Sequence, residues 1–340
     1  MSLPTRKIGD ANVSCVGFGA MGLSAYYGSP MIDEERFKVL DAAHEQGCTF
    51  WDTSDIYGDS EDLISQWFKR TGKRSEIFLA TKFAFRAIDS KGATLDGTPE
   101  YARLAIDNSL KRLGVDQIDL WYLHRPDANV PIELTIGAMA EAVKAGKVKY
   151  IGISECSEDT LRRAHAVYPI AAAQFEYAPF TLNIEDPQIG IWNACKELGI
   201  TLVAYSPLGR GLLSGKLDPD ALSDKDIRKL FDFPRFQKEN FQLVLKVVDT
   251  LTEIGKRHDA TSAQVALAWL LAQGPNVIPI PGTTNVRRLE ENANARHVKL
   301  TPGEVKEIRD AVERAGLHEV PRVAKGFSHM SYVDTPQLYK

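Results

Sequence analysis

Cysteine is scarce in this sequence, and its placement limits what the protein can be. Only 4 of the 340 residues are cysteine, and no two of them have C-x-x-C spacing: Cys15, Cys48, Cys156 and Cys195. This pattern argues against a disulfide scaffold and against a ribbon-type metal site. Isolated thiols are typical of a reducing compartment, so we expect a cytoplasmic protein.

Long hydrophobic runs and an excess of basic residues are also missing. No apolar run approaches the ~18 residues that cross a bilayer, and the opening stretch MSLPTRKIGDANVS lacks the apolar centre of a signal peptide. With 41 Lys and Arg against 45 Asp and Glu, the net charge is −4. We therefore expect no export signal and no membrane anchor. Nucleic acid is not an expected partner either.

Short apolar runs that alternate with helical patterns fill most of the chain. The eight strand candidates are residues 15–19, 49–55, 77–83, 118–124, 150–154, 171–177, 201–207 and 276–282, and amphipathic segments such as 33–47, 99–114, 132–146 and 187–199 lie between them. Near-continuous apolar strands alternating with helices indicate a parallel sheet that is covered on both faces. Eight such units predict a (β/α)8 barrel, an α/β fold, in one domain over residues 1–340 with its core at about 15–315.

Several stretches depart from this rhythm. Residues 5–14 alternate around a turn at Gly9 and Asp10, which predicts a hairpin that plugs the bottom of the barrel. Residues 85–99 and 209–237 follow the third and seventh strands directly, so we expect them to be substrate loops at the C-terminal rim. For the tail, residues 316–340, a solvated and partly disordered surface segment remains an alternative.

Four titratable residues stand in or after these apolar strands: Asp52 and Tyr57 after the second strand, Lys82 in the third and His124 at the end of the fourth. Each alone has a plain structural alternative, such as a turn aromatic or a core histidine. In a barrel, however, all four meet at one rim. A lysine held by an aspartate would lower the pKa of a neighbouring phenol, and a histidine would orient a carbonyl. Together they predict an active site that protonates a carbonyl oxygen while another group delivers hydride to its carbon.

A glycine-rich run, residues 17–22, matches the G-x-G-x-x-G dinucleotide fingerprint. That fingerprint should open a helix directly and meet an acidic residue ~20 positions later, whereas LSAYYGSP follows here. We therefore interpret these glycines as permitting close approach of the backbone to a ligand at the first rim loop.

The motifs WDTSDIYG, ATKF, DLWYLHR, KVKYIGIS, AYSPLGRGLLSGK and IPIPGTTNVRRLEEN resemble, in this order along essentially the whole chain, those of the aldo-keto reductase superfamily. The stretches at 152–170 and 197–211 resemble its branch of plant auxin-induced-type and fungal pyridoxal reductases. The resemblance implies a catalytic tetrad of Asp52, Tyr57, Lys82 and His124. It also implies NADPH as hydride donor, bound across the barrel mouth without a Rossmann fold.

By the same resemblance, a set of residues is expected to bind the cofactor. Ser154 and Gln174 would bind the nicotinamide carboxamide, Tyr205 would stack on the nicotinamide ring, and Ser206, Leu208, Gly209, Arg210, Gly282 and Thr283 would line the pyrophosphate. Arg288 would bind the 2′-phosphate, with Glu291 and Asn292 at the adenine. A planar guanidinium suits a phosphate, although a solvated helix face is the plain alternative for the VRRLEEN segment.

Two positions depart from the family pattern. Glu155 stands where many members have Asn as a second carboxamide partner, and a carboxylate cannot donate a hydrogen bond to the carbonyl. Thr284 lacks the charge of some relatives, which leaves Arg288, with Arg287 beside it, to recognise the phosphate.

The sequence leaves the substrate and two rival functions open. Tyr26, Tyr27, Phe85 and the 209–237 loop are candidates for an aromatic substrate pocket, with packing or surface as alternatives. Pyridoxal-like aldehydes, quinones and sugar-derived carbonyls all fit, and the oligomeric state is unreadable. The main rival to a reductase is a cofactor-binding regulatory subunit that resembles channel-associated β-subunits. A metal-dependent hydrolase is a weaker rival, because no His and carboxylate cluster has ligand spacing, and we expect no metal.

Overall fold

The computed structural model describes residues 4–28, 30–89, 92–231 and 233–338. Residues 90–91 and 232 of the two predicted rim loops lie outside the described residues. So do 339–340 of the tail, together with residues 1–3 and 29.

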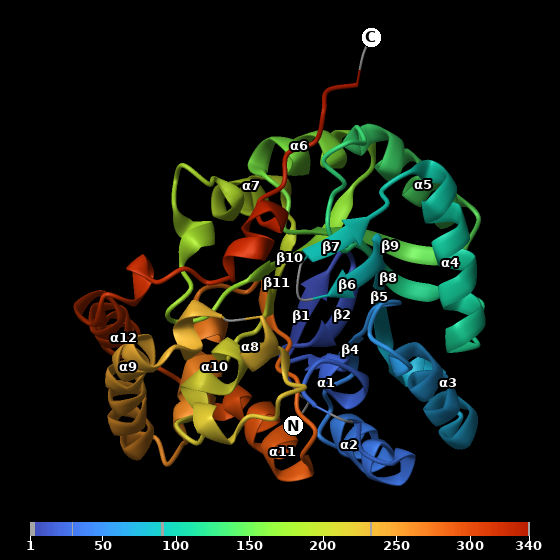
Figure 1. The fold of residues 1–340 in the computed structure, drawn as a ribbon. Helices are drawn as coiled ribbons and strands as arrows, with labels where there is room; N and C mark the ends of the chain where they lie inside the picture. Colours follow the sequence, from blue (N-terminus) through green and yellow to red (C-terminus); the bar gives the residue numbers. More distant parts are fainter. Residues whose placement is uncertain (1–3, 29, 90–91, 232, 339–340) are drawn as a thin grey trace.

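Eight parallel strands form the central sheet, in the order β12-β11-β10-β9-β8-β5-β4-β3. Their bounds are β3 Phe18–Gly19, β4 Phe50–Asp52, β5 Phe78–Phe83, β8 Ile118–Leu123, β9 Val148–Ser154, β10 Ile170–Glu176, β11 Thr201–Tyr205 and β12 Val277–Pro279. A parallel bridge between Gly19 and Gly282 joins the two ends of the sheet, and Figure 1 shows helices arranged around the strands. The predicted (β/α)8 barrel is confirmed, and each of the eight predicted runs contains or overlaps a strand.

Glycines in the 17–22 run make this closure possible. A Cβ at Gly19 would lie 2.9 Å from the carbonyl oxygen of Ile280, and one at Gly17 would lie 2.9 Å from both Ile280 and Phe50. These two glycines therefore allow close contact between strands. Gly19 and Gly22 of the same run also line the cavity at the rim, so the predicted approach of a ligand to this backbone stays a prediction. The run leads only into the one-turn helix α1 Met21–Ser24, and α2 begins at Asp33, so it does not have the structure of a dinucleotide fingerprint.

The helices follow the predicted pattern. Those that cover the barrel are α2 Asp33–Glu45, α3 Ser60–Thr71, α4 Pro99–Leu113, α5 Ile132–Lys144, α6 Glu158–Val167, α7 Ile191–Leu198, α9 Lys238–Arg257, α10 Ser262–Ala272, α11 Val286–Asn294 and α12 Pro302–Ala315. Their boundaries follow from capping chemistry. In α4, for example, the Thr98 side chain accepts from the Tyr101 N–H, and Gly114 ends the helix at φ 64°.

The predicted N-terminal hairpin is present as β1 Thr5–Ile8 and β2 Ala11–Ser14, paired antiparallel. Its buried side chains Ile8 and Val13 pack with residues from inside the barrel, among them Phe50 and Leu120. Because a strand places alternate residues on opposite faces, Ile8 and Val13 share the face of the hairpin that is turned toward the barrel. The hairpin fills the interior of the barrel at the end opposite the rim loops.

Both rim loops and the tail have local structure of their own. Residues 85–99 contain the hairpin of β6 Phe85–Asp89 and β7 Gly92–Leu95, which Figure 1 shows drawn across the barrel strands. Residues 209–237 hold short helices, namely η3 Gly209–Ser214, η4 Pro219–Ala221, α8 Ile227–Leu230 and η5 Pro234–Phe236. In the tail, η7 Leu317–Glu319 and η8 Lys325–Met330 pack on the barrel, so the solvated alternative is wrong for most of it. The remaining short helices are η1 Arg74–Glu76, η2 Asn183–Glu185 and η6 Ala295–His297.

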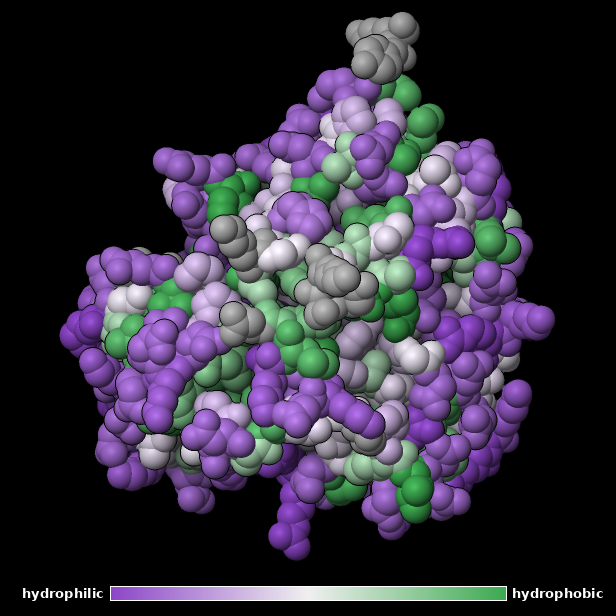
Figure 2. All heavy atoms as spheres, viewed as in Figure 1, coloured by the Kyte–Doolittle hydropathy of each residue, from purple (hydrophilic) through white to green (hydrophobic). Residues whose placement is uncertain are grey.

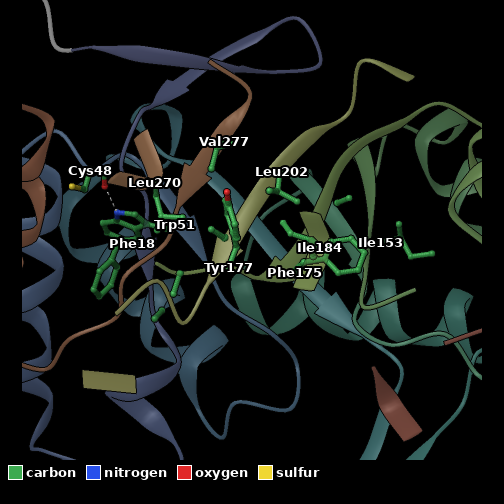
Figure 3. Packing of buried hydrophobic residues seen from close by; sticks show 14 of the residues in the cluster. Phe18, Cys48, Trp51, Ile153, Phe175, Tyr177, Ile184, Leu202, Leu270 and Val277 are labelled. Carbon is green, nitrogen blue, oxygen red and sulfur yellow. Dashed lines mark hydrogen bonds between the residues drawn. The ribbon is translucent and has the colours of Figure 1, made fainter. Parts of the chain in front are cut away.

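The main core lies between the strands and the helices. Figure 3 shows part of it, with Trp51 and Phe18 packed together near Leu270 and with the indole of Trp51 hydrogen-bonded to Cys48. The donor is Trp51 Nε1 and the acceptor is the Cys48 carbonyl, 2.7 Å away. Within the described residues no helix combines the length and apolarity that a bilayer span requires, and no three metal-ligating side chains come together.

Truncating the plug should destabilise the barrel. Ile8 is fully buried, so Ile8→Ala should lower the free energy of unfolding by about 2–5 kcal/mol, because the hairpin cannot fill the cavity that is left. Urea denaturation would measure this. Leu104→Ala on α4 is the matched control, because Leu104 is 54% exposed, and its effect should stay within about 0.5 kcal/mol. Equal losses in the free energy of unfolding for the two variants would contradict the packing of the hairpin inside the barrel.

Candidate active site

Strand alternation brings the predicted residues together. Phe50, Ala80, Leu120 and Ala172 point into the barrel. Residues two positions apart on a strand share a face. On β4, β5 and β10 the next inward residues are therefore Asp52, Lys82 and Gln174. His124 follows β8 four positions after Leu120, on the same alternation. The inward face is therefore apolar at depth and polar at the C-terminal rim.

Lys82 is the centre of this group. Its ammonium is fully buried and donates to Asp52 Oδ1 at 2.5 Å and to the Thr53 carbonyl at 2.8 Å. The other oxygen of Asp52 accepts from Gln174 Nε2 at 2.8 Å. Burial lowers the pKa of Lys82, and the negative charge of Asp52 partly opposes that shift. The ion pair links β4, β5 and β10 beneath the rim.

Tyr57 and His124 face each other above this pair. The Tyr57 hydroxyl lies 3.3 Å from His124 Nε2, and the ammonium of Lys82 is 5.0 Å from the centre of the Tyr57 ring. Burial, assisted by Asp52, raises the pKa of Tyr57, while Arg125 opposes the shift. The net shift of the Tyr57 pKa is therefore upward, opposite to the lowering that the sequence led us to expect. The phenol thus stays protonated at neutral pH.

His124 is held as a neutral imidazole. Burial lowers its pKa well below the ordinary value, and the nearby charges of Lys82 and Arg125 act in the same direction. Its Nδ1 lies 3.1 Å from Ser54 Oγ. When the Ser54 hydroxyl donates to Nδ1, the imidazole hydrogen is on Nε2, which faces Tyr57.

Sequence reasoning missed three polar neighbours of this group, namely Ser54, Asp55 and Arg125. Ser54 Oγ also lies 3.2 Å from Asp55 Oδ1, and Arg125 Nη1 donates to Ser154 Oγ at 3.1 Å. Each is adjacent to a predicted residue or within three positions of one, in WDTSDIYG or DLWYLHR. The signal was therefore present, but alternation along a strand alone does not tell which polar neighbours turn inward after the strand ends.

A cavity of about 440 Å³ opens above these residues. Besides Asp52, Tyr57, His124 and Gln174, the predicted residues on its wall are Tyr26, Tyr27, Phe85, Tyr205, Ser206, Leu208, Arg210, Gly282, Thr283, Arg288, Glu291 and Asn292. The predicted substrate loops also reach the wall, through Ile88 of residues 85–99 and through Phe231 and Phe233 of residues 209–237. Phe327 and Met330 of the tail, which we did not predict, lie there as well. In Figure 2, viewed as in Figure 1, hydrophobic residues gather near the centre of this face and hydrophilic ones around it.

Three predicted residues are not on the cavity wall. Lys82 lies beneath it, behind Asp52, and Ser154 is buried with its hydroxyl bonded to Arg125. Gly209 lies in the loop after β11, where a Cβ would come within 2.2 Å of Phe180. Arg287, considered beside Arg288, is also absent from the wall.

The loop after β11 has an unusual backbone. Ser206, Gly209, Arg210 and Gly211 all have positive φ, at 47°, 58°, 56° and 97°. A non-glycine residue in this region costs of order 1 kcal/mol and is concentrated at ligand sites, where successive N–H groups form a concave surface for anions. Across the cavity, α11 begins beside Gly282 and Thr283, so its N-terminal N–H groups also favour an anion.

The fold, the loop and the four polar residues are those of one family. A model of the Aldo/keto reductase family matches residues 15–313. The chain belongs to the aldo/keto reductase family. It is 53% identical to aldo-keto reductase str7 of Strobilurus tenacellus over 99% of each chain. It is 49% identical to aldo-keto reductase yakc [NADP(+)] of Schizosaccharomyces pombe over 100% of each.

A solved structure supports the same assignment. The glycerol dehydrogenase AKR11B4 from Gluconobacter oxydans superposes with a TM-score of 0.83 at 27% identity, covering 93% of this aldo-keto reductase and 97% of that chain. The family predicted from the motifs is therefore confirmed.

Glu155 has its oxygens occupied in this aldo-keto reductase. Its Oε1 accepts from the Tyr205 hydroxyl at 3.0 Å and from the Glu176 N–H at 3.2 Å, and both oxygens accept from Arg322 of the tail. Glu155 is fully buried and does not line the cavity. The doubt about its contact with a cofactor thus has a physical basis, since its carboxylate binds protein groups instead.

The pH dependence of the free energy of unfolding should show that the pKa of Asp55 is raised in the folded protein. Burial, and then the charge of Glu61, raise the pKa of Asp55 to about 7, above the unfolded value of about 3.9. The folded state therefore binds more protons between about pH 4 and pH 7, and this contribution to stability is lost as pH rises through that window. Asp55→Asn cannot ionise, so its stability relative to wild type should improve from pH 4 to pH 7 in urea denaturation.

The control for this comparison is Asp249→Asn, which changes an exposed carboxylate on α9. Its stability relative to wild type should vary less across the same window. A constant difference between Asp55→Asn and wild type would mean that Asp55 ionises as freely in the folded state as in the unfolded one.

Proposed function

We propose that this protein reduces an aldehyde or ketone to an alcohol, with NADPH as the hydride donor and Tyr57 as the general acid. The observation that supports this most directly is the buried arrangement of Asp52, Lys82, Tyr57 and His124 at the floor of a cavity. Family membership supports the reaction class, and the name of the Schizosaccharomyces pombe relative supports NADP(H).

The cavity wall fits a long anionic dinucleotide. At one end lie the polar floor and Tyr205, and in the middle lies the positive-φ loop around Ser206 and Arg210. The far end holds Arg288 with Asn292 on α11. The bound cofactor would supply hydride to the carbonyl carbon. In this assignment Gln174 and Tyr205 hold the nicotinamide, and Arg288 binds the 2′-phosphate.

Proton delivery follows from the state of Tyr57. Because burial keeps the phenol protonated, it carries a proton at neutral pH. An alkoxide is a stronger base than a phenolate, so proton transfer from Tyr57 Oη to the substrate oxygen is favourable once negative charge develops there. Lys82 then stabilises the phenolate across the 5.0 Å to its ring.

His124 orients the carbonyl. A neutral imidazole with its hydrogen on Nε2 donates to the substrate oxygen without competing as an acid. In this proposal the Ser54 hydroxyl, 3.1 Å from Nδ1, donates its hydrogen there and so selects that tautomer. The carbonyl oxygen would therefore lie between Tyr57 Oη and His124 Nε2, which are 3.3 Å apart in this structure and would separate to admit it.

The substrate side of the cavity is aromatic. Phe85 packs edge-on against His124 with ring centres 4.8 Å apart, Tyr26 packs edge-on against Tyr57 at 6.1 Å, and Phe231 stacks on Phe327 at 4.8 Å. Such walls bind planar apolar groups better than hydroxylated ones. We therefore propose aromatic carbonyl compounds as the preferred substrate class.

Removing the phenol oxygen should separate chemistry from binding. Tyr57→Phe should lower kcat for reduction of an aromatic aldehyde by roughly 10²–10⁴-fold, the usual contribution of a general acid. The Kd for NADPH should stay within about twofold, because the ring remains. Absorbance at 340 nm and fluorescence titration would measure the two. Full turnover by Tyr57→Phe would reject its role, and absent turnover by the wild type would favour the regulatory subunit.

The 2′-phosphate contact is tested by comparing two cofactors. Arg288→Ala should raise the Kd for NADPH about tenfold or more and leave that for NADH nearly unchanged, because only NADPH carries the charge that the guanidinium would bind. Arg287→Ala is the matched control, since Arg287 does not line the cavity. Equal losses for both cofactors, or for both arginines, would contradict the assignment.

A further inference from the structure

A buried cluster of charges lies behind the cavity wall, and the reaction described above does not use it. Its members are Glu155, just after β9, Glu176 at the end of β10, and Arg322 of the tail, which are 0%, 1% and 7% exposed. Arg322 Nη1 donates to Glu155 Oε1 at 3.1 Å and to Glu176 Oε2 at 3.2 Å, while Nη2 donates to Glu155 Oε2. The guanidinium of Arg322 thus bridges two carboxylates, each of which is far from Arg322 in the sequence.

The cluster is connected to the cavity through Tyr205. The hydroxyl of Tyr205 donates to Glu155 Oε1 at 3.0 Å, and Arg322 Nη1 lies 3.4 Å from the same hydroxyl. The Tyr205 ring lines the cavity, whereas Glu155 does not. Glu155 therefore holds the outer end of the ring from behind. A tyrosine side chain has two χ angles, and this hydrogen bond restricts both.

Arg322 keeps Glu155 ionised and thus a strong acceptor. Burial alone would raise the pKa of Glu155, but the charges of Arg322 and then Arg125 outweigh it and hold the pKa below its ordinary value. Arg125 donates to the Tyr205 hydroxyl at 3.4 Å and to Ser154, and within the described residues it makes no hydrogen bond to Glu155. Arg210 is paired with Glu176, at 3.2 Å, and Glu176 has the same sign as Glu155.

The tail is docked at the same place. The Val333 N–H donates to the Glu155 carbonyl at 2.8 Å, and the Ser157 N–H donates to the Val333 carbonyl at 2.9 Å. These bonds hold Glu155 at φ 54°, which a non-glycine residue seldom adopts. From the same tail, Phe327 and Met330 reach the cavity wall. Seating of the tail and placement of Glu155 therefore depend on one set of contacts.

We propose that Arg322 is a positioning residue which, through Glu155, sets the orientation of the Tyr205 ring, so that the contact of Arg322 with Glu155, rather than attachment of the tail as a whole, supports binding of the nicotinamide. This rests on the proposed function, in which Tyr205 lies against the nicotinamide ring. Arg322 touches neither cofactor nor substrate in this account. Arg322 acts by holding the Tyr205 ring in place before the cofactor binds, so that less conformational freedom is lost on binding.

The test is a double-mutant cycle of Arg322→Met and Tyr205→Phe, read out as cofactor binding. Each single variant should raise the Kd for NADPH about tenfold, and the double variant should be no worse than either one, because both changes release the same ring. Arg322→Lys keeps the charge and should recover part of the loss. The Kd for 2′-phospho-ADP-ribose, which lacks nicotinamide, should stay within about twofold in all variants.

Arg163→Met is the matched control. Arg163 anchors the far end of the tail by donating to the carbonyls of Thr335 and Pro336, and it contacts neither Glu155 nor Tyr205 in the described residues. Its Kd for NADPH should match that of the wild type. An equal loss for Arg163→Met, additive losses in the cycle, or a parallel loss of 2′-phospho-ADP-ribose binding would overturn the proposal.

Folding is checked without cofactor. Hydrogen exchange in Arg322→Met should rise in residues 317–338 and around Glu155 and stay unchanged in the barrel strands. If hydrogen exchange in Arg322→Met also rises in the barrel strands, Glu155→Gln takes the place of Arg322→Met in the cycle. Glu155→Gln keeps the shape of the side chain and removes its charge. A wild type that binds NADPH but reduces no carbonyl compound would refute the proposed function alone, since the cycle measures binding. A wild type that does not bind NADPH would contradict both.

Discussion

The ion pair between Lys82 and Asp52 is the interaction on which the rest of the site depends. Both side chains are almost fully buried, and the removal of one partner from such a pair costs about 3–5 kcal/mol because the other charge is left in a medium of low dielectric. The pair is acceptable because its remaining polar atoms are used, by the Thr53 carbonyl and by Gln174. Lys82 and Asp52 lie on the neighbouring strands β5 and β4, and Gln174 joins the pair from the more distant strand β10.

Around this pair the protein controls charge by exclusion of water. The phenol of Tyr57 stays protonated and the imidazole of His124 stays neutral, because burial disfavours the charged form of each. The Tyr57 hydroxyl and His124 Nε2, which lie 3.3 Å apart, are therefore both uncharged. The charged pair, Lys82 and Asp52, lies one layer below them.

Much of this arrangement could be predicted from the sequence, for reasons that particular residues illustrate. The strands were readable because β4, β5 and β8 are apolar on both faces, so a lysine or an aspartate within them is conspicuous. Their meeting at one rim followed from the geometry of a barrel. The pKa of Tyr57 is raised rather than lowered, because burial and the charge of Asp52 dominate, and spacing along the chain does not carry that information.

The contacts of the tail could not be predicted from the sequence for a similar reason. Nothing near Arg322 indicates that its partners are Glu155 and Glu176, which precede it by 167 and 146 residues. Ser154 and Gly209 were assigned to cofactor contact by motif alone, yet neither is on the cavity wall. Motifs identify the residue types at a site, whereas the packing of distant segments decides which of them line the cavity.

The long separation between Arg322 and its acids has a consequence during synthesis. A ribosome makes Glu155 and Glu176 well before Arg322, and of the two acids Glu176 already has Arg210 as a partner. Until the tail arrives, the Glu155 carboxylate lacks the guanidinium that donates to both of its oxygens. Burial of Glu155 behind Tyr205 therefore costs less once the end of the chain has been made and has packed on this wall.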